Sequence, residues 1–507
     1  MKALSLNLEK QYLAQQMITV KKQAKYLQIA AAFRETIKQG FLMPDEPLPS
    51  SRTLAKQLNV NRHTVMAALA ELVAQGWLET KLRSGYRVAA ALPIQTSKSL
   101  SPIIIKKGNK SVINEINPAT FQWRFRRQAT VAVSLAKKAS DYRYNFSGGY
   151  PDMNSFPFDE FKSCFNDFCQ RPKIPSLSYG DSAGEPELIS EISKYLRRVR
   201  SIKNKELLVC NGSQEGLYLI SQLLLGVGDG VAVEERGYPP AWAAFKSTGA
   251  NLVTIKQDKY GIIPEHLAVQ LSHCNIKLIY LTPLHQYPTT VTLVVSRRMK
   301  IYQLAAQYGV GIIEDDYDHE FHYNSQPIAP MAADDPLGLV IYVSTFSKLM
   351  FGGARIGYVV ANTELIAKLT AYKALINHKT NVMMQQTVAK WMQQGGFERH
   401  LRRMTRLYHK RRDFMINVLK GYQQQGLPIS FTCPAGGMAL WVNMGKSIVG
   451  LKETLLSKNV YLQTEVEFSL ATDSEKEDYR FVRLGFAAMS ETECVQGIKI
   501  IVESLYR

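Results

Sequence analysis

The spacing of apolar positions over the first ninety residues predicts three helices followed by two short strands. Apolar residues recur at helical intervals from 27 to 37, and further helices are predicted over 52–58 and from Arg62 to about Leu72. From 77 to 88 apolar and polar residues alternate on either side of Arg83-Ser84-Gly85, a pattern typical of a β-hairpin. This region therefore predicts a small domain of mixed helix and strand.

The pattern changes after about residue 140. Short apolar runs rich in β-branched residues, such as 207–210, 310–313 and 340–345, alternate with helical patterns as in a wound α/β domain. The stretch before it combines proline with Lys and Arg and has little periodicity, which indicates a linker that can contain short ordered stretches. We therefore expect four regions: an N-terminal extension (1–20), a helical and β-hairpin domain (21–90), a basic linker (91–140) and an α/β domain (141–507).

Composition and charge indicate a globular protein with a binding partner of opposite charge. A chain of 507 residues is too long for one compact core, while 46% hydrophobic and 21% charged residues are ordinary for a globular protein. Residues 1–140 carry 22 Lys and Arg against 7 Asp and Glu, whereas the remaining residues carry 40 against 36. A basic excess at one end is typical of a protein that binds a polyanion, although a solvated basic linker would produce part of the same excess.

Cysteine spacing and hydropathy exclude several classes. The six cysteines have no CxxC pair and no accompanying histidine spacing, which argues against a zinc site or a disulfide framework, and no metal is predicted. The chain lacks an apolar signal core, and no apolar run approaches the roughly 18 residues of a membrane helix. We expect a cytoplasmic protein that does not bind a membrane.

The second and third predicted helices have the arrangement of a helix-turn-helix. Such a motif lays its second helix in the major groove of DNA, where the first residues of that helix reach base edges and phosphates. Here the helix begins at 61–64, Arg52 opens the supporting helix, and Lys81, Arg83 and Arg87 lie along the hairpin. A protein-docking module with a solvated basic face is the alternative. The hairpin and the uneven charge favour DNA.

A second kind of chemistry is indicated around Lys348. This lysine follows a β-branched strand and a Ser/Thr turn, and Arg355 comes seven residues later behind a glycine pair. A lysine so placed can form a Schiff base with pyridoxal 5′-phosphate while the hydroxyls and the arginine hold the phosphate. Asp315 precedes it by 33 residues, at the end of a predicted strand, and suits the pyridine nitrogen. The alternative for the acidic run 314–318 is a magnesium site.

Two further segments are compatible with a cofactor pocket. The strand at 207–210 leads through Gly212 and Ser213 into an apolar helix, and unpaired N–H groups at a helix start bind phosphate. Tyr238 follows the strand 231–233 and could stack on a cofactor ring. Each segment alone is weak evidence, because many strand-turn-helix units and tyrosines are purely structural.

The sequence LPSSRTLAKQLNVNRHTVMAALAELVAQGWLETKLRSGYRV (48–88) closely resembles the winged helix of GntR-type regulators. The region 141–507 resembles fold type I aminotransferases through motifs that include NGSQEGL (211–217), IIEDDYD (312–318), TFSK (345–348) and GGARIGY (352–358). Their order is similar to that of MocR-type regulators. The resemblance implies an N-terminal α+β winged helix-turn-helix and a C-terminal α/β domain of the pyridoxal-phosphate-dependent transferase fold type I.

For double-stranded DNA, the resemblance implies that Arg52 and Arg62 contact the operator and that Gly85 lets the wing tip enter the minor groove. Met66 stands where the family commonly has an arginine, so the sequence preference should differ. The complete predicted DNA-binding set is Arg52, Arg62, His63, Thr64, Lys81, Arg83, Ser84 and Gly85.

For the cofactor, the resemblance implies that Lys348 forms the Schiff base, that Asp315 pairs with the pyridine nitrogen and that Arg483 binds the carboxylate of an effector. Tyr317 would bond the ring hydroxyl and Tyr238 would stack on the ring. The phosphate would be held by Gly212, Ser213, Gln214, Thr345 and Arg355, with Tyr179 reaching it from the other subunit of a homodimer.

Two positions depart from the aminotransferase pattern. The turn Tyr287-Pro288-Thr289-Thr290 lacks the usual asparagine and glycine, and Ala439 stands where related regulators often have histidine. The predicted function is a DNA-binding transcriptional regulator that uses its aminotransferase-like domain to sense an amino acid or amine. The alternative is a working aminotransferase whose N-terminal module only docks a partner.

Overall fold

The computed structural model describes residues 24–81, 85–93, 104–107, 110–113, 139–172, 174–178, 180–323, 328–470 and 478–506. The chain divides into two compact units, 1–128 and 129–507, so the division falls inside the segment predicted as a linker. Within the described ranges, no helix combines the length and the apolar character that crossing a bilayer requires.

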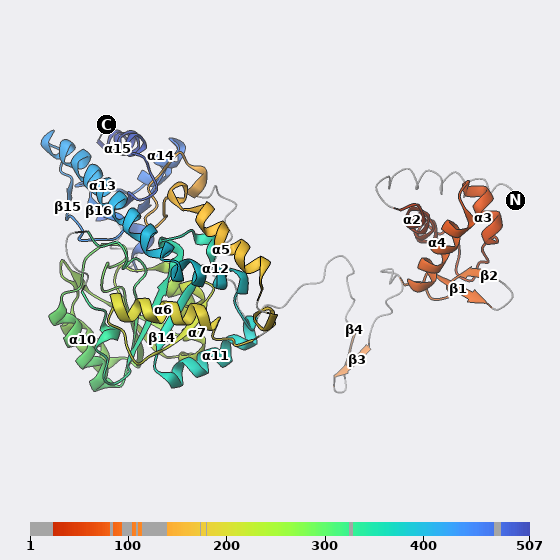
Figure 1. Ribbon diagram of the computed structural model, residues 1–507, viewed down its shortest axis with the longest axis horizontal. Coiled ribbons are helices and arrows are strands. Elements are labelled where there is room, and N and C mark those ends of the chain that lie inside the picture. Colours follow the sequence, from red (N-terminus) through yellow and green to blue (C-terminus); the bar gives the residue numbers. More distant parts are fainter. Residues whose placement is uncertain are drawn as a thin grey trace. The chain divides into compact units, whose positions relative to one another are not determined.

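The N-terminal unit contains the three predicted helices and the predicted hairpin (Figure 1). Its apolar core includes Ile29, Phe33, Leu54, Leu69 and Trp77, which come from all three helices and from the chain just before the hairpin. The helices are α2 (Lys25–Lys38), α3 (Ser51–Leu58) and α4 (Arg62–Ala74), and the antiparallel strands are β1 (Leu78–Lys81) and β2 (Gly85–Val88).

Side-chain caps fix the turn between α3 and α4. The hydroxyl of Ser50 accepts a hydrogen bond from the backbone N–H of Thr53 (3.2 Å), which starts α3. Asn59 ends α3 in the left-handed region (φ 51°), and the Asn61 side chain accepts from the His63 N–H (2.9 Å) to start α4. Each cap of this kind stabilises a helix by about 1 kcal/mol. The turn at 59–61, between the helices predicted over 52–58 and from Arg62, is thereby confirmed.

One short ordered stretch lies inside the predicted linker. Strands β3 (Ile104–Lys107) and β4 (Lys110–Ile113) pair antiparallel, with Lys107 opposite Lys110. The expectation of short order within this segment is confirmed for these eight residues.

The larger unit is built on a seven-stranded sheet with the order β6-β14-β13-β12-β11-β7-β8. Strand β14 runs antiparallel to both neighbours, and the other strands share one direction. Both β7 and β13 are buried along their whole length, as expected for central strands covered on both faces. The strands are β6 (Glu206–Cys210), β7 (Gly230–Glu234), β8 (Asn251–Ile255), β11 (Ile276–Leu281), β12 (Gly311–Asp315), β13 (Val340–Thr345) and β14 (Gly357–Ala361).

A smaller antiparallel sheet, in the order β15-β16-β19-β18, lies near the C-terminal helices (Figure 1). Its strands are β15 (Ser430–Phe431), β16 (Ala439–Asn443), β18 (Gln463–Thr464) and β19 (Phe481–Gly485), and the remaining short strands are β5 (Tyr144–Asn145), β9 (Gln257–Asp258), β10 (Gly261–Ile262) and β17 (Val460–Tyr461). The helices of this unit are α5 (Phe158–Gln170), α6 (Pro186–Val199), α7 (Ser213–Leu224), α8 (Pro239–Lys246), α9 (Pro264–His273), α10 (Val295–Tyr308), α11 (Thr363–Asn377), α12 (Val382–Gln393), α13 (Gly396–Gln424), α14 (Leu451–Ser457) and α15 (Glu491–Tyr506).

Two element boundaries differ from the sequence prediction. Strand β12 continues through Glu314 and Asp315, because their backbones pair with β13 and the Glu314 carboxylate accepts the backbone N–H groups of residues 331 and 332. The apolar pattern predicts that the helix after strand 207–210 begins at Gly216, whereas α7 begins at Ser213. The reason is that Gly212 (φ 81°) turns the chain directly from the strand into the helix.

Candidate functional site

A cavity of about 540 Å³ lies at the carboxyl ends of β12 and β13, and the first residues of α7 also line it. Open α/β sheets bind ligands at this edge. Nine of the ten residues predicted to bind the cofactor line it, namely Gly212, Ser213, Gln214, Tyr238, Asp315, Tyr317, Thr345, Lys348 and Arg355. The tenth, Tyr179, lies outside the described residues.

Lys348 ends a single turn of 3₁₀ helix (Phe346–Lys348) directly after β13. Its amine points at Gly149, where an added Cβ would lie 3.0 Å from Nζ. Burial lowers the pKa of Lys348, and the nearby Arg483 guanidinium lowers it further, whereas Asp318 and Asp315 oppose the shift. A lysine with a lowered pKa is more often neutral, and the neutral amine is the nucleophilic form.

Asp315 is buried at the end of β12, and only one of its two carboxylate oxygens has a hydrogen-bond partner among the described residues. Tyr280, on the neighbouring β11, donates its hydroxyl hydrogen to Oδ2 (2.9 Å), while Oδ1 has no hydrogen-bond partner among the described residues. Burial raises the pKa of Asp315 to about 7, and the hydrogen bond from Tyr280 opposes this rise. Because a buried carboxylate oxygen is costly without a partner, this atom suits a protonated ring nitrogen supplied by a ligand.

The start of α7 forms a cradle for an anion. Gly212 lies so close to Arg355 that an added Cβ would be 3.0 Å from Nη2. Arg355 is itself held by a 2.5 Å hydrogen bond to the carbonyl of Asn211. Gly357 approaches Gly212 even more closely, since a Cβ added at Gly357 would lie 2.4 Å from the Gly212 carbonyl carbon. A phosphate there would meet helix N–H groups and a guanidinium, so these residues fit the phosphate of pyridoxal phosphate.

Hydrogen bonds position three of the remaining predicted cofactor residues, Thr345, Gln214 and Tyr317. The Thr345 hydroxyl donates to Ser347 Oγ (2.9 Å), and the Gln214 amide donates to the carbonyl of Pro240 (2.8 Å). Tyr238 precedes α8. Tyr317 donates its hydroxyl hydrogen to the carbonyl of His285 (3.1 Å), so its oxygen can still accept a hydrogen bond from a ligand.

Arg483 lies on β19, is 1% exposed and is not among the lining residues, but it borders Gly148 and Tyr287, which line the cavity. Its Nε and Nη1 groups have no hydrogen-bond acceptor among the described residues, and its guanidinium carbon lies 4.5 Å from the centre of the Tyr287 ring. Only a glycine fits at position 148, because a Cβ there would be 1.6 Å from Nη1. Buried guanidinium N–H groups without acceptors are suited to a carboxylate.

The two departures from the aminotransferase pattern have structural consequences. Thr290 takes the glycine position with φ 62°, a left-handed conformation that is strained for a β-branched residue, and its N–H donates to the Gln286 carbonyl (2.7 Å). Tyr287 replaces the asparagine and presents its ring to Arg483. Ala439 is buried beside Gly148, where an added Cβ would lie 3.1 Å from its own.

The acidic run 314–318, which begins inside β12, does not converge on one point. Glu314 binds backbone N–H groups, Asp316 forms a 2.5 Å ion pair with Arg200, and Asp318 contacts His285 Nδ1 at 2.7 Å. No group of three or more His, Cys, Asp or Glu side chains in the described ranges is placed to hold a metal ion. The partners of these carboxylates therefore argue against a magnesium site.

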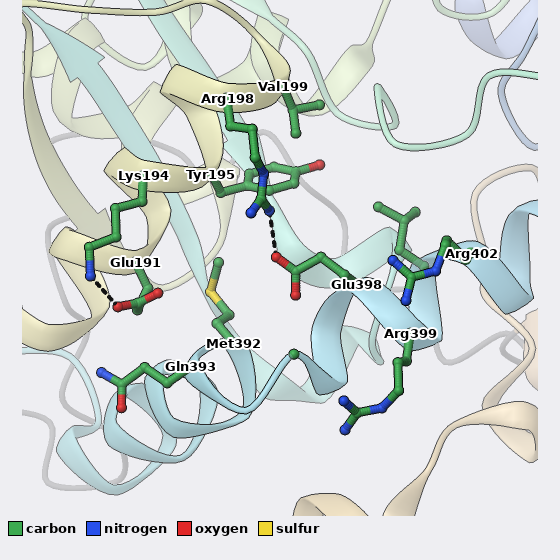
Figure 2. A pocket seen from close by; sticks show the side chains of 12 residues that line it. Glu191, Lys194, Tyr195, Arg198, Val199, Met392, Gln393, Glu398, Arg399 and Arg402 are labelled. Atoms are coloured by element: carbon green, nitrogen blue, oxygen red, sulfur yellow. Dashed lines mark hydrogen bonds and ion pairs between the residues drawn. The ribbon is translucent and has the colours of Figure 1, made fainter.

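A separate cavity of about 720 Å³ lies between α6 and the α12–α13 region (Figure 2). It shares no lining residue with the cavity around Lys348. Its lining charges largely pair with each other: Lys194 contacts Glu191 at 2.7 Å, and Arg198 contacts Glu398 at 2.5 Å. We assign no chemistry to this cavity.

In the N-terminal unit, the predicted DNA-binding residues lie at the start of α4 and on the hairpin. Arg52, Arg62, His63 and Lys81 are exposed, and Arg62 Nε donates to Ser51 Oγ (3.3 Å). Thr64 is half-buried, and Gly85 (φ 81°) opens β2, while Arg83 and Ser84 lie outside the described residues. Arg87 lies on β2, as expected for the wing, and its guanidinium lies 3.7 Å from the Asp45 carboxylate.

Sequence reasoning missed Tyr280 and the buried pair His285–Asp318. Tyr280 ends an apolar strand and has no polar neighbour in sequence that would mark it. Its role arises only because β11 lies next to β12 in the sheet. The pairing of His285 with Asp318 likewise joins residues 33 positions apart.

Together, the winged helix and the wound sheet with its lysine-centred cavity define a helix-turn-helix protein fused to an aminotransferase fold. Residues 147–501 match the aminotransferase class I and II family, and residues 25–88 match the gntR family of bacterial regulatory proteins. A solved kynurenine aminotransferase of Pyrococcus horikoshii is 28% identical, with a TM-score of 0.66, and the match covers 72% of this chain and 90% of that one.

Curated relatives carry both parts. The HTH-type transcriptional regulator TauR of Rhodobacter capsulatus is 29% identical over 93% of this chain and 94% of its own length. The probable rhizopine catabolism regulatory protein MocR of Rhizobium meliloti is 28% identical over 79% of this chain and 78% of its own. This chain belongs to the MocR-type transcriptional regulators, in which a GntR-type winged helix precedes an aminotransferase class I domain.

Proposed function

We propose that this regulator binds pyridoxal 5′-phosphate in the cavity around Lys348 and senses an amino acid or amine there. The observation that carries the proposal is the unpaired buried Oδ1 of Asp315, which faces the cavity of the lysine and the anion cradle. When bound, the cofactor would supply an aldehyde that captures amines and a ring that withdraws electrons. Lys348 would attach it, Asp315 would accept its ring N–H, and Gly212, Ser213 and Arg355 would hold its phosphate.

The other predicted residues would complete the cofactor site. Gln214 and Thr345 would add hydrogen bonds to the phosphate, as would Tyr179 from the second subunit of a homodimer. Tyr238 would cover one face of the ring, and Tyr317 would bond the ring hydroxyl. The support for these roles is that all of them except Tyr179 line the same cavity.

Arg483 would bind the effector carboxylate. Its Nε and Nη1 groups lack acceptors among the described residues, and a carboxylate accepts charge-assisted hydrogen bonds from a guanidinium. Because the same guanidinium lowers the pKa of Lys348, a bound carboxylate would offset its charge and ease protonation of that amine. A charge-neutralising effector thus changes the electrostatics at the lysine as well as filling the cavity.

The winged helix would read double-stranded DNA in the cytoplasm. Arg62, His63 and Thr64 begin α4, and Arg52 begins the supporting helix; they would contact base edges and phosphates. Lys81, Arg83, Ser84 and Gly85 would bring the wing to the minor groove and backbone. Support comes from the exposure of Arg52, Arg62, His63 and Lys81 and from the basic excess of residues 1–140.

Sensing requires that the effector bind two arrangements of the protein with unequal affinity. Arg483→Ala should weaken the effector by about 10- to 150-fold, since hydrogen bonds between charged groups contribute about 1.5–3 kcal/mol. It should leave DNA binding without effector unchanged. Arg480→Ala is the matched control, because this exposed arginine lies just before the same strand and its side chain forms an ion pair with nearby Asp478 rather than with a residue of the cavity. Effector titration of both variants, with and without operator DNA, measures the coupling.

The rival function is a working aminotransferase, and the intact trio of Lys348, Asp315 and Arg483 favours testing it. Linkage requires operator DNA to change effector affinity by the factor by which the effector changes DNA affinity. Identical effector curves with and without DNA, accompanied by rapid conversion of amino acid and keto acid, would refute the regulator and establish the enzyme.

A further inference from the structure

Several residues that line the cavity around Lys348 have no role in the proposed cofactor set, and their side chains are uncharged. Among the described lining residues, the only charged side chains are Lys348, Asp315 and Arg355, all assigned above to the cofactor. The remaining wall consists mainly of aromatic, apolar and amide groups: Tyr150, Met153, Tyr287, Tyr461 and Gln463. The side chain of an effector would therefore meet no further charged group among the described lining residues.

The aromatic rings of this wall already face cations. The Arg483 guanidinium lies 4.5 Å from the centre of the Tyr287 ring, and the Lys452 ammonium lies 5.5 Å from the centre of the Tyr461 ring. Lys452 is in turn ion-paired with Glu467. A basic effector side chain would compete with these cations for the rings, and an acidic one would find Lys452 neutralised.

Two further lining residues, Tyr150 and Met153, are apolar or aromatic and exposed within one protomer. Tyr150 is 49% exposed and Met153 is 53% exposed, although both line the cavity. An apolar effector side chain would cover part of this surface, and burying apolar area is favourable. A charged side chain in the same place would lose hydration without gaining a partner.

Ser147 adds a polar group next to Gly148. The residue lines the cavity, and its buried hydroxyl has no hydrogen-bond partner among the described residues. Ser147 precedes Gly148, whose missing side chain leaves room for Arg483 Nη1. Gln463 lies opposite Arg483 in the β18–β19 pairing, so its side chain is on the same face of the sheet.

We propose that the effector carries one carboxylate and an uncharged, predominantly apolar side chain, and that Ser147 joins Arg483 in holding the carboxylate. The proposal rests on the sensor function proposed above and adds the chemical class of the effector. The side chain lies against Tyr150, Met153, Tyr287 and Tyr461.

The test is calorimetric and absorbance titration of the full-length protein loaded with pyridoxal phosphate. L-norleucine, L-glutamate and L-ornithine have side chains of similar length and different charge, and pentylamine is norleucine without the carboxylate. We expect norleucine to bind at least about tenfold more tightly than the other three. Ser147→Ala should weaken norleucine by about 2- to 10-fold and leave pentylamine unchanged.

Met153→Arg should shift the norleucine-to-glutamate affinity ratio at least about tenfold toward glutamate, because it adds a cation to the residues that line the cavity. Met299→Arg is the matched control: this exposed methionine lies on α10 and does not line the cavity. Glutamate or ornithine binding as tightly as norleucine would overturn the proposed class and leave the sensor intact. Pentylamine binding as tightly as norleucine would overturn the carboxylate seat. Absence of any response would overturn both the class and the sensor.

Discussion

The hydrogen bond from Tyr280 to Asp315 should set the pH range in which the cofactor binds. Asp315 can pair with a protonated ring nitrogen only when it is ionised, and its pKa is raised to about 7 by burial despite the Tyr280 bond. Cofactor affinity should therefore be full above that pKa and decline as the pH falls through about 7. Tyr280→Phe removes the donor and keeps the ring.

The size of the effect follows from the bond. A hydrogen bond to a charged group contributes about 1.5–3 kcal/mol, which corresponds to a further rise of about 1–2 units in the pKa of Asp315. At pH 7.5, the ionised fraction then falls about 3- to 25-fold, and cofactor affinity should fall with it. Above about pH 9.5 the variant and the wild type should converge.

Equilibrium dialysis of pyridoxal phosphate from pH 6.5 to 9.5 measures this directly. The ratio of the two dissociation constants is decisive, because the titration of Lys348 affects both proteins in the same way. Tyr302→Phe is the control, since its hydroxyl donates to Asp335 (2.8 Å), and neither residue lines the cavity. A Tyr280→Phe ratio that is the same at every pH would refute this account of Asp315.

Three further predictions concern DNA, stability and the phosphate cradle. Arg62→Ala should cost about 1–3 kcal/mol of sequence-specific DNA binding, whereas Lys81→Ala should weaken all sequences and reduce the salt dependence, as measured by titration of operator and scrambled duplexes. Arg200→Ala should lower the free energy of unfolding by about 3–5 kcal/mol, because the buried Asp316 carboxylate keeps the hydrogen bond from Tyr342 but loses its arginine counter-charge. Arg198→Ala, which removes the exposed pair with Glu398, should change the free energy of unfolding by at most about 1 kcal/mol, and denaturant titration measures both. Gly212→Ala should weaken pyridoxal phosphate binding, because the added Cβ would crowd the Arg355 guanidinium. Gly228→Ala is the control: Gly228 has nearly the same φ but nothing within 4 Å of an added Cβ, so this change should reduce stability alone. Equal affinities of the two variants for pyridoxal phosphate would contradict the cradle.

The sequence alone determined the elements and the residue types of both parts. Helical spacing, the caps Ser50 and Asn61 and the alternation around the wing are local features, so the winged helix followed from residues close together in the chain. Asp315, Lys348 and Arg355 each lie at or next to the end of a strand that the sequence predicts or the structure shows. The structure brings these three side chains into one cavity.

Tertiary structure decided which atoms are free. The sequence does not show that Tyr280 occupies one oxygen of Asp315, because that contact depends on the pairing of β11 with β12. Nor does it show that Gly148 makes room for Arg483 across more than 300 residues, or that Asp316 is taken by Arg200. Local propensity fixes elements, whereas burial and sheet order determine which polar groups remain unpaired and can bind a ligand.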